Sequence, residues 1–65
     1  MELTKEAKRA LVDTDGRVGA AIPLFGMAGV IAELFSNGLM TRAGNLTRKG
    51  TIVRQRVLDE MLEAL

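Results

Sequence analysis

The sequence predicts a small, mainly α-helical domain that carries one β-hairpin, and three observations lead to this fold class. Apolar residues recur at three- and four-residue steps in the central and C-terminal parts of the chain, as on the buried face of a helix. Between these parts, a Gly44-Asn45 pair stands between two apolar arms, which is typical of a tight turn. The 65 residues make one domain, residues 1–65, whose core is only just large enough to be stable.

The first expected element is a helix over Leu3–Val12. Thr4 is the residue type that caps a helix N-terminus, and a turn over Asp13–Gly16 is expected to end the helix, with Gly16 at positive φ. Lysine and arginine cover the solvent side of this helix. Its apolar face consists of Leu3, Ala7, Ala10 and Leu11.

The apolar centre of the chain follows, up to Met40. Residues 17–30 are compatible with a short strand, one helix or two, because Gly26 and Gly29 weaken a continuous helix. A helix is expected to reach Ser36 and to end at Gly38 as the C′ residue. Its buried face is expected to contain Leu24, Met27, Val30, Ile31, Leu34 and Phe35.

A hairpin is expected over about 38–47, with Leu39 and Leu46 as the apolar positions of its arms. Thr47 then suits the N-cap of a helix over about 48–65. In that helix an apolar stripe is broad for so small a domain, so it either packs against both preceding helices or partly pairs with a second subunit. We expect a homodimer, with the contact among Leu58, Met61, Leu62 and Leu65.

Composition limits the chemistry. The chain has no Cys and no His, and it shows no nucleophile–base pair, phosphate loop or metal-ligand cluster, so we expect neither an enzyme nor a cofactor or metal site. The absence of Cys fits a cytoplasmic protein. Val18 to Ala32 is uncharged but is shorter than the roughly 20 residues of a membrane-spanning helix, so no membrane association is expected.

Two phrases of the sequence stand out. The first is Ile31-Ala-Glu-Leu-Phe-Ser-Asn-Gly-Leu-Met40, a helix that ends in Gly-Leu, and the second is Gly44-Asn-Leu-Thr-Arg-Lys-Gly50, a turn that leads into the next helix. Together they resemble winged helix-turn-helix modules of small bacterial and phage regulators, in which the turn is the wing tip. The resemblance implies a fold of three to four helices with the hairpin as wing. It also implies either DNA binding or a role as a protein-docking unit.

The charge distribution is compatible with DNA binding, and equally with a solvated basic surface. Five basic residues and no acidic residue lie between Leu34 and Leu58. The helix before the wing offers Glu33, Ser36 and Asn37 and no basic side chain, so the expected contacts are mainly with phosphates, from the wing and the start of the last helix. The candidate DNA-binding residues are Arg42, Asn45, Arg48, Lys49 and Arg54.

The sequence therefore leaves two function classes open. One is a DNA-binding regulator whose partner is duplex DNA. The other is a small protein of the kind that phages and mobile elements encode, which docks on a host protein through an apolar face and inhibits or modulates it. Strong salt dependence of DNA binding would favour the first class.

Overall fold

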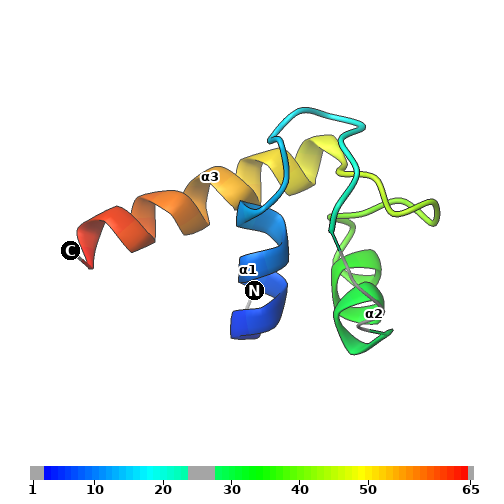
Figure 1. Cartoon of the computed structure of the whole chain (residues 1–65), viewed down its shortest axis with the longest axis horizontal. Coiled ribbons are helices and arrows are strands. Elements are labelled where there is room, and N and C mark those ends of the chain that lie inside the picture. The colour runs from blue at the N-terminus through cyan, green and yellow to red at the C-terminus, as the bar shows by residue number, and fades with distance from the viewer. Residues whose placement is uncertain (1–2, 24–27, 65) are drawn as a thin grey trace.

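Three helices make up the described part of the chain: α1 (Lys5–Val12), α2 (Ala28–Ser36) and α3 (Arg48–Glu63). The computed structural model describes residues 3–23 and 28–64. Helix α1 packs against both α2 and α3, and the C-terminal half of α3 projects beyond α1 (Figure 1). This projection makes the molecule elongated, with extents of 33 × 21 × 20 Å. The expectation of a mainly helical domain with three to four helices is confirmed.

Helix α1 begins and ends with the local chemistry that its sequence predicts. The Thr4 hydroxyl accepts the Ala7 N–H at 3.2 Å and caps the first turn. After the helix, the Thr14 hydroxyl donates to the Leu11 carbonyl at 2.7 Å, and Gly16 has a φ of 82°. The predicted apolar face is confirmed, because Leu3, Ala7, Ala10 and Leu11 are all buried.

Helix α2 ends in a Schellman motif at the predicted glycine. Gly38 has a φ of 73°, and its N–H donates to the Phe35 carbonyl at 3.0 Å. The Leu39 N–H donates to the Leu34 carbonyl at 2.9 Å, and these two leucine side chains are fully buried. The motif turns the chain sharply from α2 toward the next segment.

The segment expected to be a hairpin contains only isolated antiparallel bridges. Within the described residues, these bridges do not extend into a strand of several residues. Met40 bridges Leu46, and the Thr41 N–H donates to the Asn45 carbonyl at 2.8 Å. On its other side this segment bridges Ala21, through Asn45. The ladder stays short because the chain has little length between the end of α2 and the N-cap of α3.

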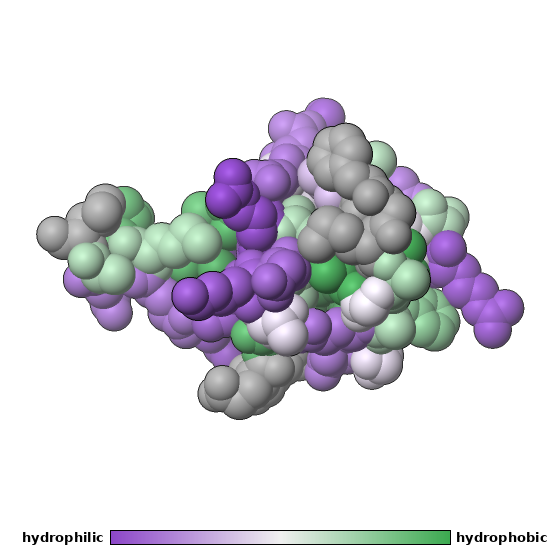
Figure 2. All heavy atoms as spheres, turned by 60° about the horizontal axis from the view of Figure 1, so that its bottom comes forward, coloured by the Kyte–Doolittle hydropathy of each residue, from purple (hydrophilic) through white to green (hydrophobic). Residues whose placement is uncertain are grey.

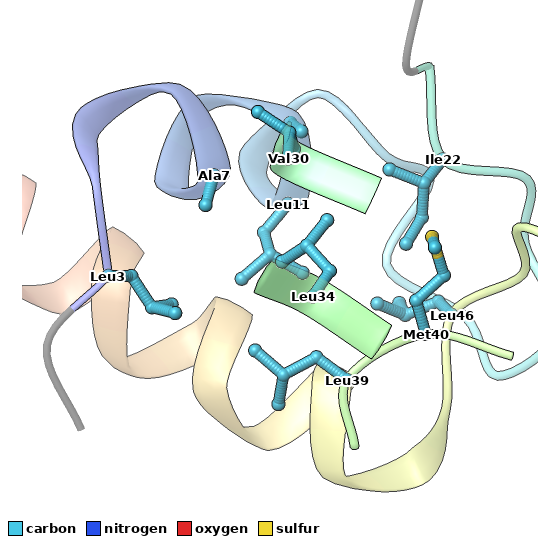
Figure 3. Close-up of a cluster of buried hydrophobic side chains, with 10 residues drawn as sticks. Leu3, Ala7, Leu11, Ile22, Val30, Leu34, Leu39, Met40 and Leu46 are labelled. Atoms are coloured by element: carbon cyan, nitrogen blue, oxygen red, sulfur yellow. The ribbon is translucent and has the colours of Figure 1, made fainter. Parts of the chain in front are cut away.

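The core lies where α1, α2 and the bridged segment meet. Figure 3 shows Leu11 of α1 and Leu34 of α2 meeting at its centre, with Leu39, Met40 and Leu46 closing one side. These side chains are aliphatic or Met, as the composition predicts. Of the expected central face, Val30 and Leu34 are buried and Ile31 and Phe35 are exposed, while Leu24, Met27 and Gly26 lie outside the described residues. Gly29 lies inside α2.

Helix α3 uses only part of its apolar stripe in this core. Val57 is buried, and Val53 and Leu58 are half-buried, because α1 crosses the first part of the helix. Met61 and Leu62 are exposed on the projecting end. Within residues 3–23 and 28–64, no helix combines the length and the apolar character that crossing a bilayer requires.

Candidate nucleic-acid interface

Thr47 joins the end of α2 to the beginning of α3. Its hydroxyl accepts the Gly50 N–H at 3.0 Å and donates to the Gly38 carbonyl at 2.7 Å. One side chain therefore caps α3 and satisfies a carbonyl at the end of α2. The first turn of α3 is fixed beside the bridged segment by this contact.

Gly50 brings α3 into direct contact with the backbone of that segment. A Cβ atom at Gly50 would lie 2.4 Å from the Leu39 carbonyl oxygen and 2.7 Å from Leu46 Cδ1. Any side chain at this position would push α3 away from the core. The position of the first turn of α3 therefore depends on this glycine.

Three of the predicted DNA-binding residues remain exposed at this edge of the molecule. Arg42 lies in the turn after α2, and Arg48 and Lys49 lie in the first turn of α3. That turn contains no acidic residue, and the ion pairs of the described residues involve none of these three cations. The N-terminus of α3 adds the partial positive charge of a helix end beside Arg48 and Lys49. We call Arg42, Arg48 and Lys49 the basic edge.

Arg42 also lies over an aromatic ring. Its guanidinium carbon is 6.0 Å from the centroid of the Phe35 ring, at the outer limit of a cation–π contact. Phe35 is exposed on α2. The contact therefore links the turn to the exposed face of the helix that precedes it.

The other two predicted DNA-binding residues use their side chains inside the molecule. The Asn45 side-chain amide donates to the Gly19 carbonyl at 2.8 Å. The Arg54 guanidinium donates to the carbonyls of Leu11 at 3.1 Å and Thr14 at 3.3 Å. Arg54 thus caps the C-terminus of α1. On α3 it follows the first turn, which carries Arg48 and Lys49. Neither role is evident from the sequence, because each depends on contacts with a distant segment.

Glu33 is the one acidic residue between Asp15 and Asp59, and both oxygens of its carboxylate accept hydrogen bonds. Oε2 accepts the Thr4 N–H and Oε1 accepts the Thr4 hydroxyl, each at 2.8 Å. The carboxylate is therefore held at the N-terminus of α1. No local signal in the sequence indicates the contact with Thr4.

The residues predicted to form a dimer contact do not behave as one group. Leu58 is half-buried, while Met61 and Leu62 are exposed to 44% and 68%. Leu65 lies outside the described residues. Hydrophobic side chains are visible on the projecting end of α3 and, separately, on the side of the molecule that carries α2 (Figure 2).

A groove of about 340 Å³ runs along α3 where α1 approaches it. Its floor is apolar, with Leu3, Val53 and Val57, and Ile52 stands at its side with 58% of its surface exposed. Its charged lining residues are Lys8, Lys49, Arg56 and Glu60. Glu60 and Lys8 form an ion pair across it at 3.8 Å.

The described residues contain no group of three or more Asp, Glu, His or Cys side chains that could hold a metal ion. No model of a known protein family matches the chain, and neither a curated protein nor a solved structure is significantly similar to it.

Proposed function

We propose that the protein is a winged-helix-type domain that binds duplex DNA mainly through phosphates. In this proposal α2 corresponds to the helix that approaches the groove, the bridged segment around Met40 and Leu46 to the wing, and α3 to the helix that follows the wing. The order of the elements supports the assignment: α1, the bridged residue Ala21, α2, the bridged segment, then α3.

The basic edge is the observation that carries the proposal. Arg42, Arg48 and Lys49 are exposed, none of them forms an ion pair within the described residues, and the N-terminus of α3 adds its own partial charge. Backbone N–H groups and cations together are the usual phosphate ligands of DNA-binding proteins. The nearest acidic residue in the sequence, Glu33, is bonded to Thr4.

The exposed face of α2 argues for phosphate contacts and against direct reading of bases. Its exposed side chains are small or apolar, apart from the short hydroxyl of Ser36. Base edges in the major groove are read by Arg, Lys, Asn, Gln, Asp or Glu, which this face does not present. We therefore expect modest sequence preference and a strong dependence of affinity on salt.

The test is binding of a fluorescent DNA duplex, followed by anisotropy at several salt concentrations. Each phosphate contact contributes about 0.9 to the slope of log K against log salt, so Arg42→Ala and Arg48→Ala should each lower the slope by about that amount. Lys5→Ala is the matched control, because it removes an exposed positive charge from α1, away from the basic edge. The proposal is wrong if the parent does not bind, or if Arg42→Ala and Arg48→Ala both bind like the parent.

One observation favours protein docking as a second candidate function. Ile31 and Phe35 lie four residues apart on α2, and 38% and 45% of their surfaces are exposed. Paired apolar side chains at this spacing are typical of a helix face that contacts a partner protein. Failure of DNA binding, with loss of a partner complex on Phe35→Ala, would favour this candidate.

A further inference from the structure

The outer face of α3 carries an exposed row of side chains that the core does not use. Ile52, Gln55, Asp59 and Leu62 follow one another at steps of three, four and three residues, the spacing of a coiled-coil seam. All four residues are exposed. The two apolar members lie at the ends of the row, and the polar pair lies in its middle, where the Gln55 amide donates to Asp59 Oδ1 at 3.1 Å.

The charges of α3 are divided along its length. The basic residues Arg48, Lys49, Arg54 and Arg56 all precede the acidic residues Asp59, Glu60 and Glu63. The first turn contains no acidic residue and the last turn no basic residue. Since a helix is positive at its N-terminus and negative at its C-terminus, each end of α3 carries side chains of the same sign as the dipole, which is unfavourable within the single helix.

We propose that a second copy of this chain lies antiparallel to α3 along this row, with Ile52 of each copy packed against the partner's Leu62. Charge complementarity selects this occupant and this direction. An antiparallel copy places the acidic end of one α3 beside the basic end of the other. The dipoles of the two helices then point in opposite directions, which is favourable. A parallel copy would place like charges beside one another along the whole contact.

The partner's Leu62 packs against Ile52, which stands at the side of the groove. Both side chains are exposed in the single chain, Ile52 to 58% and Leu62 to 68%. Their contact removes exposed apolar surface of α3 from water.

Arg56 and Glu63 supply the charged contact of this arrangement. Neither forms an ion pair within the described residues, although Arg56 lies at the groove. Helical side chains tilt toward the N-terminus of their own helix, so in an antiparallel pair Arg56 and the partner's Glu63 lean toward one another. The same tilt points Arg48 away from the partner, so Arg42 and Arg48 of the basic edge stay open, while Lys49 lines the groove beside the contact. The dimer does not depend on DNA binding.

Sedimentation equilibrium of the whole chain tests the contact. We expect a concentration-dependent dimer, an at least tenfold weaker dimer for Arg56→Glu and for Glu63→Arg, and recovery when both substitutions are in one chain. Leu62→Glu should give a monomer, whereas Val18→Glu, which places the same charge on an exposed apolar residue away from α3, should not. A monomeric parent, or no recovery in the double variant with circular dichroism unchanged, overturns the proposal.

Disulfide trapping tests the direction of the helices. The chain contains no Cys, so Ile52→Cys and Leu62→Cys introduce single thiols without background. Oxidation of an equal mixture of the two variants should give mainly the mixed 52–62 disulfide, as close contact between the two positions requires. Mainly 52–52 and 62–62 disulfides, or none, would overturn the antiparallel arrangement.

Discussion

Glu33 and Thr4, which are 29 positions apart in the sequence, are joined by two hydrogen bonds. The Glu33 carboxylate accepts the backbone N–H and the hydroxyl of Thr4, each at 2.8 Å. Thr4 is at the same time the N-cap of α1, so the contact connects the first turn of α1 to the middle of α2. It fixes the orientation of the helix that approaches DNA in the proposed function.

We predict a measurable coupling between these two residues. Glu33→Ala and Thr4→Ala should each lower the free energy of unfolding, and the double variant should lose about 1 kcal/mol less than the sum of the two, because the charge-assisted contact is lost only once. The contact is exposed, which keeps this value modest. Urea denaturation of the four proteins measures it, and additive losses would contradict the contact.

Gly50 should tolerate no side chain. Gly50→Ala adds a Cβ atom 2.4 Å from the Leu39 carbonyl oxygen, so we expect a loss of about 1–3 kcal/mol in the free energy of unfolding, despite the better helix propensity of Ala. Gly29→Ala in α2 is the matched control, because nothing lies within 4 Å of its Cβ position. That variant should gain about 0.5 kcal/mol. Equal effects of the two substitutions in thermal melts would refute the close packing.

Arg54 should affect stability more than DNA affinity. Its guanidinium caps carbonyls at the end of α1, so Arg54→Ala is expected to cost about 1–2 kcal/mol of unfolding free energy. Arg54→Lys keeps the charge but cannot reach both carbonyls with the same geometry, so it should recover only part of this loss. In the anisotropy assay Arg54→Lys should retain the salt slope of the parent. Parent-like stability of both variants would argue against the cap.

Much of the local structure could be predicted from the sequence, because helix ends are determined within a few residues. Thr4 and Thr47 cap α1 and α3, and Gly38 ends α2, as their residue types predict. The hairpin was predicted from its turn residues. Turn chemistry does not set the length of a ladder, and only isolated bridges form in the described residues.

The partners of the polar side chains could not be predicted in this way. Glu33 contacts Thr4, Asn45 contacts a carbonyl 26 positions away, and Arg54 contacts one 43 positions away. Each contact depends on how the helices pack, and the local sequence shows which face of a helix is buried but not which segment it packs against. Two of the five predicted DNA-binding side chains were therefore found to have internal roles, while the three of the basic edge remain exposed.

Titration of a short DNA duplex into the isotope-labelled protein, followed by amide chemical shifts, tests the proposed function most directly. The account predicts that at low salt the largest shifts occur at the amides of residues 42–50, around Arg42 and the first turn of α3, and that they shrink as salt is added. The amides around Lys5 serve as an internal reference. Shifts that are absent at low salt, or that are confined to α1 or to the C-terminal end of α3, would contradict the account.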